Sequence, residues 1–352
     1  MEFSYQFPVV RGIQANREYY ITMVPLRLLR NLFSIDDEYV LPEYRAQRKL
    51  NIKRIPIISK YILENRDTYV FSAFAASIDG DFRFIPSKEN NDIGMLSISM
   101  DAKLLINDGQ HRKAAILEAI NEDPSLLNET ISIVFYSDLG LERSQQMFTD
   151  LNKHAVRTSN SIAELYDSRD NLAVATRQIV SKIGFLDKYT DKEIDILGKY
   201  SSNLFTLSTF YKANSRIIKK PEDFDEKFLF EYWRDVVNNI LPWKELEQHQ
   251  LSKVDLRENY VITKAVVIQA LGRLGKYFYS NLNINKSDVL LELQKIDWRR
   301  NSDIWKMRIV SKNGRIINNE TAIILACNAI KKALGISLDR LEIEKEKQIS
   351  KV

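Results

Sequence analysis

Apolar residues in the first 157 positions switch between the alternating spacing of strands and the three-to-four spacing of helices. Runs rich in β-branched and aromatic residues predict strands at residues 9–13, 19–24, 69–78, 82–85, 95–100, 104–106 and 131–136. Helical spacing predicts helices at residues 25–33, 42–64, 112–120 and 141–152. Pro56 should kink or divide the second of these helices. Asp79-Gly80-Asp81 has the composition of a hairpin turn.

Beyond residue 157 the pattern is almost wholly helical. The clearest predicted helices are residues 160–166, 171–183, 224–240, 260–279 and 320–334. The sequence therefore predicts an α+β protein, with an α/β domain at residues 1–157 and a helical domain at residues 158–336. Residues 337–352 form a charged C-terminal tail that we expect to be mobile or weakly docked.

Composition adds a cellular context to this fold. Of the 352 residues, 45% are hydrophobic, which is enough to fill a core, and 11 Gly and 8 Pro are too few for a low-complexity or linker-dominated chain. Cys327 is the single cysteine and lies in an apolar helical run, so we expect it to be buried and inert. The opening MEFSYQFPVVRG lacks a basic segment followed by a long apolar run, and no stretch is long and apolar enough to span a membrane. A cytoplasmic protein without a membrane partner is expected.

Net charge is close to balanced, because 51 Lys and Arg face 47 Asp and Glu, giving +4. Basic residues nevertheless gather in runs that are candidates for phosphate contacts with double-stranded DNA. The first run contains Arg45, Arg48, Lys49, Lys53 and Arg54, the second spans residues 153–157 and ends at Arg157, and the third contains Lys212, Arg216, Lys219 and Lys220. Each run alone is more typical of a solvated helix face, whereas together they favour DNA binding.

The most informative segment for chemistry is Asp108-Gly109-Gln110-His111-Arg112, where an apolar strand breaks at a glycine and a helix begins at once. Such a turn exposes backbone N–H groups at a helix N-terminus, which favours a bound anion. His111, Arg112 and Lys113 are placed against the helix dipole, and a bound phosphate would offset that repulsion. The simpler interpretation is that Asp108 caps the helix while Arg112 and Lys113 are solvated.

This segment resembles the DGQHR signature of a bacterial family that includes the DndB proteins, which are encoded with DNA phosphorothioation genes. The resemblance extends to residues 69–80 and 148–161, and so covers nearly the whole chain. It implies a DNA-binding regulator of the sulfur-modification genes with a repressor-like role. The implied partners are double-stranded DNA and other DNA sulfur-modification proteins.

More distantly, the order of strand, glycine turn, helix, strand and helix is similar to the ParB and sulfiredoxin superfamily, whose domain has a mixed sheet. That resemblance implies a site for ATP or CTP with Mg²⁺. The implied phosphate-binding residues are Asp108, Gly109, Gln110, His111, Arg112, Asn152 and Lys153, and Asp150 would contribute an oxygen to Mg²⁺. Asp150 departs from the asparagine usual in ParB proteins, and Gln110 replaces the sulfiredoxin cysteine, so thiol chemistry is not expected.

Three functions remain open at this point. The first is a DNA-binding regulator, expected to be a homo-oligomer because a symmetric dimer suits a palindromic site. The second is an enzyme that hydrolyses nucleotides in a DNA modification or defence system, with Asp150 and Mg²⁺. The third is an assembly factor that binds other modification proteins through its helical half.

Overall fold

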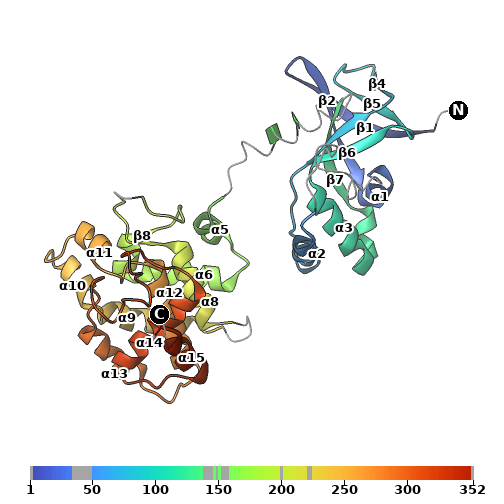
Figure 1. The fold of residues 1–352 in the computed structure, drawn as a ribbon. Coiled ribbons are helices and arrows are strands. Elements are labelled where there is room, and N and C mark those ends of the chain that lie inside the picture. The colour runs from blue at the N-terminus through green and yellow to red at the C-terminus, as the bar shows by residue number, and fades with distance from the viewer. Residues whose placement is uncertain are drawn as a thin grey trace. The chain divides into compact units, whose positions relative to one another are not determined.

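The computed structural model describes residues 3–33, 50–137, 146–147, 150–151, 158–198, 201–219 and 224–349. The chain divides into two compact units, Met1–Val156 and Arg157–Val352 (Figure 1). The first contains a mixed β-sheet with short helices, and the second is mainly helical, so the predicted α+β class is confirmed. Within the described residues, no helix combines the length and the apolar character needed to cross a membrane.

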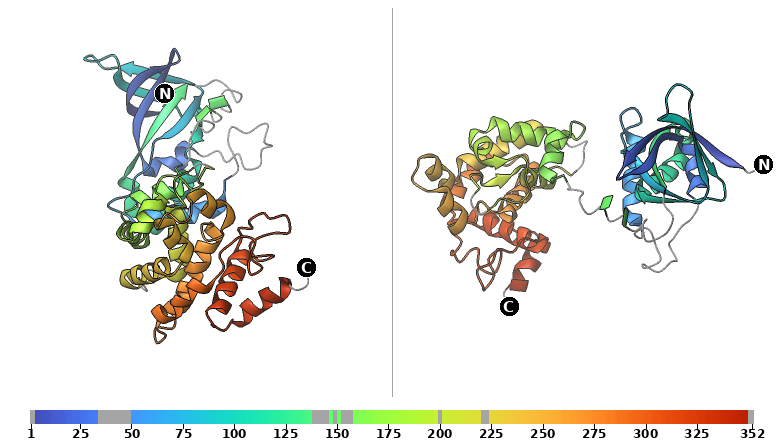
Figure 2. Two further views of the ribbon diagram at one scale, coloured as in Figure 1. Left: turned by 90° about the vertical axis from the view of Figure 1, so that its left-hand side faces the viewer. Right: turned by 90° about the horizontal axis from the view of Figure 1, so that it is seen from above.

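A β-sheet organises the first unit (Figure 2). It has seven strands in the order β4-β5-β1-β2-β7-β3-β6. Its strands are β1 (Ser4–Gln14), β2 (Arg17–Pro25), β3 (Phe74–Asp79), β4 (Phe82–Pro86), β5 (Ile93–Ser99), β6 (Lys103–Asp108) and β7 (Thr130–Ser137). β3 and β7 run parallel, and the other neighbouring pairs are antiparallel. The sheet is therefore mixed, and β6 lies at one of its edges.

Two turns with positive φ angles connect strands of this sheet in different ways. Ala15 and Asn16 have φ angles of 51° and 59° and close the β1–β2 hairpin, because a turn with two positive φ values matches the strand twist. Gly80 also has a positive φ, but β3 pairs with β6 and β7 while β4 pairs with β5. The predicted hairpin at residues 79–81 is therefore wrong, since the turn sends the two strands to different parts of the sheet.

Short helices cover one face of the sheet. They are η1 (Leu26–Leu28), α1 (Leu29–Leu32), η4 (Ile52–Arg54), α2 (Ile55–Glu64), α3 (Gln110–Glu122) and η5 (Pro124–Asn128). With the exception of η4, which buries none of its residues, these helices contribute apolar residues to one core with the strand residues that point the same way. The alternate strand residues, among them Val10, Ile21, Met23 and Met95, are exposed on the other face.

Three predicted elements of this unit have different bounds in the structure. The helix expected at residues 25–33 is split into η1 and α1. Pro56 lies in the first turn of α2, where proline is tolerated, so it opens a helix and does not kink one. The strand expected from residue 69 begins only at Phe74, because Phe71 packs on Tyr61 of α2 and Tyr69 packs on Phe71, outside the sheet.

The second unit is built mainly from helices. They are α5 (Asn160–Tyr166), α6 (Asn171–Lys182), α7 (Gly184–Tyr189), α8 (Leu207–Ile217), α9 (Glu226–Asn238), α10 (Leu241–Glu247), α11 (Lys253–Asn259), α12 (Ala265–Tyr279), α13 (Lys286–Leu290), η7 (Leu291–Lys295), α14 (Glu320–Ala333) and α15 (Arg340–Ile349), with the short strands β8 (Thr190–Asp191) and β9 (Phe205–Thr206). α12 packs directly against α8, since a Cβ at Gly272 would lie 2.3 Å from the Ala213 carbonyl oxygen. Cys327 is buried as predicted, and burial raises the pKa of its thiol to about 12.

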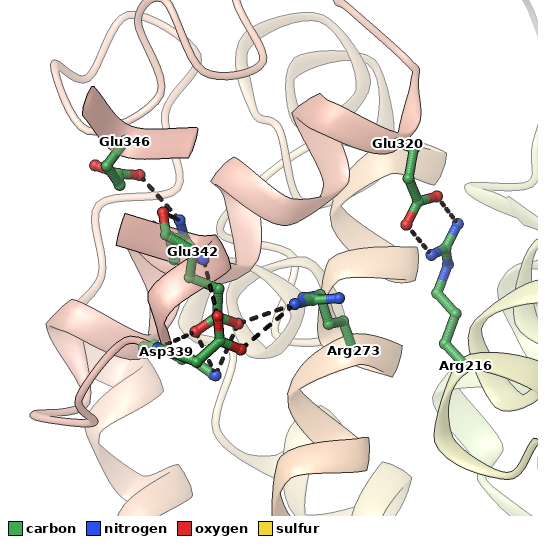
Figure 3. Close-up of polar contacts among 8 residues, drawn as sticks. Arg216, Arg273, Glu320, Asp339, Glu342 and Glu346 are labelled. Atoms are coloured by element: carbon green, nitrogen blue, oxygen red, sulfur yellow. Dashed lines mark hydrogen bonds and ion pairs between the residues drawn. The ribbon is translucent and has the colours of Figure 1, made fainter. Parts of the chain in front are cut away.

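The charged tail is not weakly docked, as the sequence suggested, because residues 340–349 form α15 and bind α14 and α12. Glu342 is 1% exposed, and its carboxylate accepts hydrogen bonds of 2.9 Å from Lys331 and lies 3.2 Å from Arg273 (Figure 3). Glu346 pairs with Arg308 and Lys332 at 2.8 and 2.6 Å. A buried carboxylate is tolerated only when it is paired, and the partners here fix the helix in place.

We predict that Glu342→Gln lowers the free energy of unfolding by about 3 kcal/mol, because it leaves the buried Lys331 ammonium without its counter-charge. The control is Glu344→Gln, which removes the partner of the exposed Arg340 and should cost less than about 1 kcal/mol. Urea unfolding of both variants measures the difference. Equal costs for the two substitutions would contradict the assigned role of the Lys331–Glu342 pair.

Candidate functional site

The predicted turn between strand and helix is present and depends on its glycine. β6 ends at Asp108, α3 begins at Gln110, and Gly109 between them has φ 115° and ψ 4°. A Cβ on Gly109 would lie 2.5 Å from the ring of Phe74. Only glycine combines this φ with so close an approach to a side chain. Among the residues that the structure describes, no side chain caps the helix, so the interpretation of Asp108 as an N-cap is wrong.

Arg112 has partners within the protein. Its guanidinium lies 2.7 Å from the Asp108 carboxylate and 2.6 Å from the Ser72 hydroxyl oxygen, and it also donates to the Ser72 carbonyl. The guanidinium carbon is 5.2 Å from the centre of the Phe74 ring. Its side chain is 17% exposed. Arg112 therefore ties the start of α3 to the segment before β3. The roles of Ser72 and Phe74 in this contact were not predicted from the sequence.

The neighbouring basic residues are also engaged. The Nε2 atom of His111 accepts a 2.9 Å hydrogen bond from the Asn51 backbone N–H, and Lys113 donates a 2.6 Å bond to the Phe33 carbonyl. Burial, and then the nearby Arg54 guanidinium, lower the pKa of His111, which keeps the imidazole neutral and able to accept. Oxygen atoms of the protein itself thus pair with Arg112 and Lys113, and His111 is neutral, so a bound phosphate is not needed to compensate their charges.

An anion at this turn would instead meet backbone amides and the basic end of η4. The first N–H groups of α3, on Gln110 and His111, have no side-chain cap. The Asn51–His111 hydrogen bond holds η4 beside them, and η4 carries Lys53 and Arg54 with exposed side chains. The structure therefore places two members of the first basic run next to the turn. Phosphate binding here stays a prediction, and it depends on these groups more than on Arg112.

Asp150 lies elsewhere in the same unit. Its carboxylate accepts a 2.7 Å hydrogen bond from Gln146, and it lines a cavity of about 440 Å³ with Tyr136 and Ser137 at the end of β7. Phe74, which contacts Gly109, pairs with Ile133 of β7. Ile133 and Ser137 are about 13 Å apart along β7, so the cavity lies away from the glycine turn. Among the residues that the structure describes, no group of three potential ligands could hold a metal ion. Within that part of the chain, Asp150 therefore has no set of further ligands with which to bind Mg²⁺.

Several candidate residues cannot be placed. Seven lie outside the described residues: Arg45, Arg48, Lys49, Asn152, Lys153, Arg157 and Lys220. In the third basic run, Arg216 makes two 2.8 Å contacts with Glu320, whereas Lys212 and Lys219 are exposed. The sequence did not show that Arg216 has an internal partner, because Glu320 is far away along the chain.

A family model described as DndB, DNA-sulfur modification-associated, matches residues 7–337, which include the glycine turn, its neighbours and most of the helical unit. The chain belongs to the DndB family. This membership associates the protein with DNA sulfur modification. Neither the curated proteins nor the solved structures with which the chain was compared contain a match, so the likeness to ParB and sulfiredoxin stays a prediction.

Gly109→Ala should destabilise this DndB-family protein by about 2 kcal/mol or more, because the new Cβ meets the Phe74 ring at an unfavourable φ. Gly184→Ala is the matched control, since a Cβ there meets no atom within 4 Å. The control should be neutral or stabilising by less than about 1 kcal/mol. Thermal and urea unfolding compare the two, and a Gly109→Ala variant as stable as the control would disprove the proposed close packing.

His111 should make stability depend on pH. Its pKa in the folded protein lies below the ordinary 6.5, so the unfolded chain binds more protons between these two values. The stabilisation is therefore complete above pH 6.5 and is lost as the pH falls through the folded pKa. His111→Gln should reduce the slope of the free energy of unfolding, measured with urea, against pH. His249→Gln removes an exposed imidazole and should leave this slope unchanged. An unchanged slope in His111→Gln would refute the assignment.

Proposed function

We propose that this DndB-family protein is a DNA-binding regulator that represses the DNA sulfur-modification genes by binding their promoter region. Family membership supports the link with sulfur modification. The observation that supports DNA contact is the surface formed by Lys53 and Arg54 of η4 beside the uncapped start of α3.

The chemistry of this surface suits a phosphate backbone. Backbone N–H groups at a helix start favour anions, and exposed lysine and arginine side chains neutralise phosphates and release counterions. Such contacts position a protein on DNA without reading its sequence, so the bases would be recognised by other residues. The surface therefore accounts for affinity and its salt dependence, and not for operator choice.

A nucleotide would bind the same surface as DNA, without being hydrolysed. The phosphates of ATP or CTP would use the same amides of Gln110 and His111, with Arg54 as the nearby cation. A nucleotide bound there would compete with DNA for the surface and so tune repression. We do not propose hydrolysis, because no group of three histidine, cysteine or acidic side chains among the described residues could hold a metal ion.

The double variant Lys53→Ala/Arg54→Ala should weaken binding to the native upstream duplex about tenfold or more at moderate salt, because two phosphate contacts are lost. The slope of log K against log salt should decrease by about 1 to 2. Electrophoretic mobility shifts across a salt series measure both quantities.

Lys88→Ala is the control for charge in this experiment. Lys88 is exposed between β4 and β5, at the sheet edge opposite β6, so its loss should leave both affinity and slope unchanged. If the double variant binds like the control, the proposed surface is wrong. If the unaltered protein fails to bind the duplex even at low salt, the regulator proposal itself is wrong and a role in assembling other modification proteins is favoured.

A further inference from the structure

The second unit contains a large cavity that the proposed DNA surface does not include. It has a volume of about 1020 Å³ and lies between α11 and residues 299–314, which precede α14. This volume is at the upper end of what binding sites for small molecules use. The cavity is therefore large enough for a ligand the size of a nucleotide.

Internal contacts fix the shape of the loop that forms the cavity. Trp298 and Trp305 are both buried and stack with their ring centres 5.4 Å apart, and the Trp305 indole N–H donates a 2.7 Å bond to the Asp297 carbonyl. The backbone N–H of Arg300 donates to the Asn259 carbonyl at 2.7 Å. A site held by buried tryptophans is already ordered before a ligand arrives, which lowers the entropic cost of binding.

The described residues that line the cavity carry a surplus of positive charge. Four are cations, Arg299, Arg300, Lys306 and Lys312, and one is a carboxylate, Asp255. Lys306 pairs with Asp303, but both side chains are exposed, so that pair is weak and easily exchanged for another anion. The surplus favours a negatively charged ligand.

A neighbouring lysine reports the same positive potential. Burial lowers the pKa of Lys264, and Arg300 and Arg257 lower it further by repulsion. Its ammonium donates to the Arg257 carbonyl, which partly compensates the burial. Of these two arginines, Arg300 also lines the cavity, so its positive charge would attract a phosphate bound there.

The floor of the cavity differs in character from its rim. Tyr260 and Val310 are buried and Met307 is half-buried, which gives an aromatic and apolar surface below the exposed Arg299, Lys306 and Lys312. Asn301 and Asn313 add side-chain amides, each of which can donate and accept hydrogen bonds. A flat apolar surface beside cations and amides suits a base joined to a phosphate.

We propose that this cavity binds a nucleoside phosphate, with the phosphate at the basic rim and the base on the floor of Tyr260, Met307 and Val310. The ligand is either a free nucleotide or a nucleotide unit of single-stranded DNA, since both present the same chemistry. This inference does not depend on duplex binding by the first unit.

Binding to the full-length protein tests the proposal. The probes are ATP and tripolyphosphate, followed by calorimetry, and a short fluorescein-labelled oligothymidylate, followed by polarisation. Lys306→Ala/Lys312→Ala should raise the Kd of any nucleoside phosphate that binds the unaltered protein about tenfold. Lys227→Ala/Lys347→Ala removes the same charge from exposed positions on α9 and α15 and should leave each Kd unchanged.

The outcomes separate the two sources of ligand. Binding of ATP alone identifies a free nucleotide, binding of the oligonucleotide alone identifies single-stranded DNA, and loss of either in the Lys306 and Lys312 variant supports the cavity. Tripolyphosphate binding as tight as ATP would overturn the role of the floor. The proposal is wrong if neither nucleoside phosphate binds, or if the two double variants behave alike. Lys53→Ala/Arg54→Ala should retain this binding, which keeps the test independent of the duplex experiment.

Discussion

The close packing of Gly109 on the ring of Phe74 is the constraint on which the first unit's candidate site depends. Phe74 is fully buried and begins β3, which β7 and β6 flank. A side chain at residue 109 would push the ring away, and Arg112 lies against the same ring while its guanidinium pairs with Asp108. The contact therefore joins β3, β6 and α3 at one point. Because it fixes the start of α3, it also fixes where the Asn51–His111 hydrogen bond holds η4.

In this arrangement the charged side chains of the DGQHR segment make internal contacts, and its backbone N–H groups are what an anion would contact. The aspartate and arginine neutralise each other, and the histidine is kept neutral and accepts a backbone hydrogen bond. An anion at the turn would then contact the backbone N–H groups at the start of α3, and the positive charge near it would come from Lys53 and Arg54 of η4. A charged motif at a helix start need not bind its ligand through its charged side chains, since those side chains can be what holds the amides in place.

Local patterns in the sequence predicted much of the fold, and non-local pairing accounts for most of the errors. Alternating residues identified β1, β2 and β7, and helical spacing gave α5 with its observed bounds, because these signals need only near neighbours. Gly80 correctly signalled a turn, but the partners of β3 and β4 are chosen by residues elsewhere in the chain. Tyr69 and Phe71 have strand propensity, yet they lie outside the sheet, because Phe71 packs on Tyr61 and Tyr69 packs on Phe71. For the site, the turn itself was predictable, whereas Ser72 and Phe74 became visible only through contacts about 40 residues away along the chain.

The same limitation governs electrostatics, because a count of basic residues along the chain does not show which of them the fold neutralises. The run at residues 212–220 looks strongly basic, but Arg216 is held by Glu320, just as Arg273 is held by Glu342 (Figure 3). Arg308 is held by Glu346 in the same way. The loop at residues 299–312 was not predicted from the sequence to be a binding site, although its cations line a cavity with a single described carboxylate, Asp255. With a net charge of only +4, the protein has positive potential where cations outnumber carboxylates locally, and not simply where basic residues are dense along the chain. The η4 surface and the cavity beside α11 belong to different units, so contact with duplex DNA and binding of a nucleoside phosphate rest on separate sets of charges.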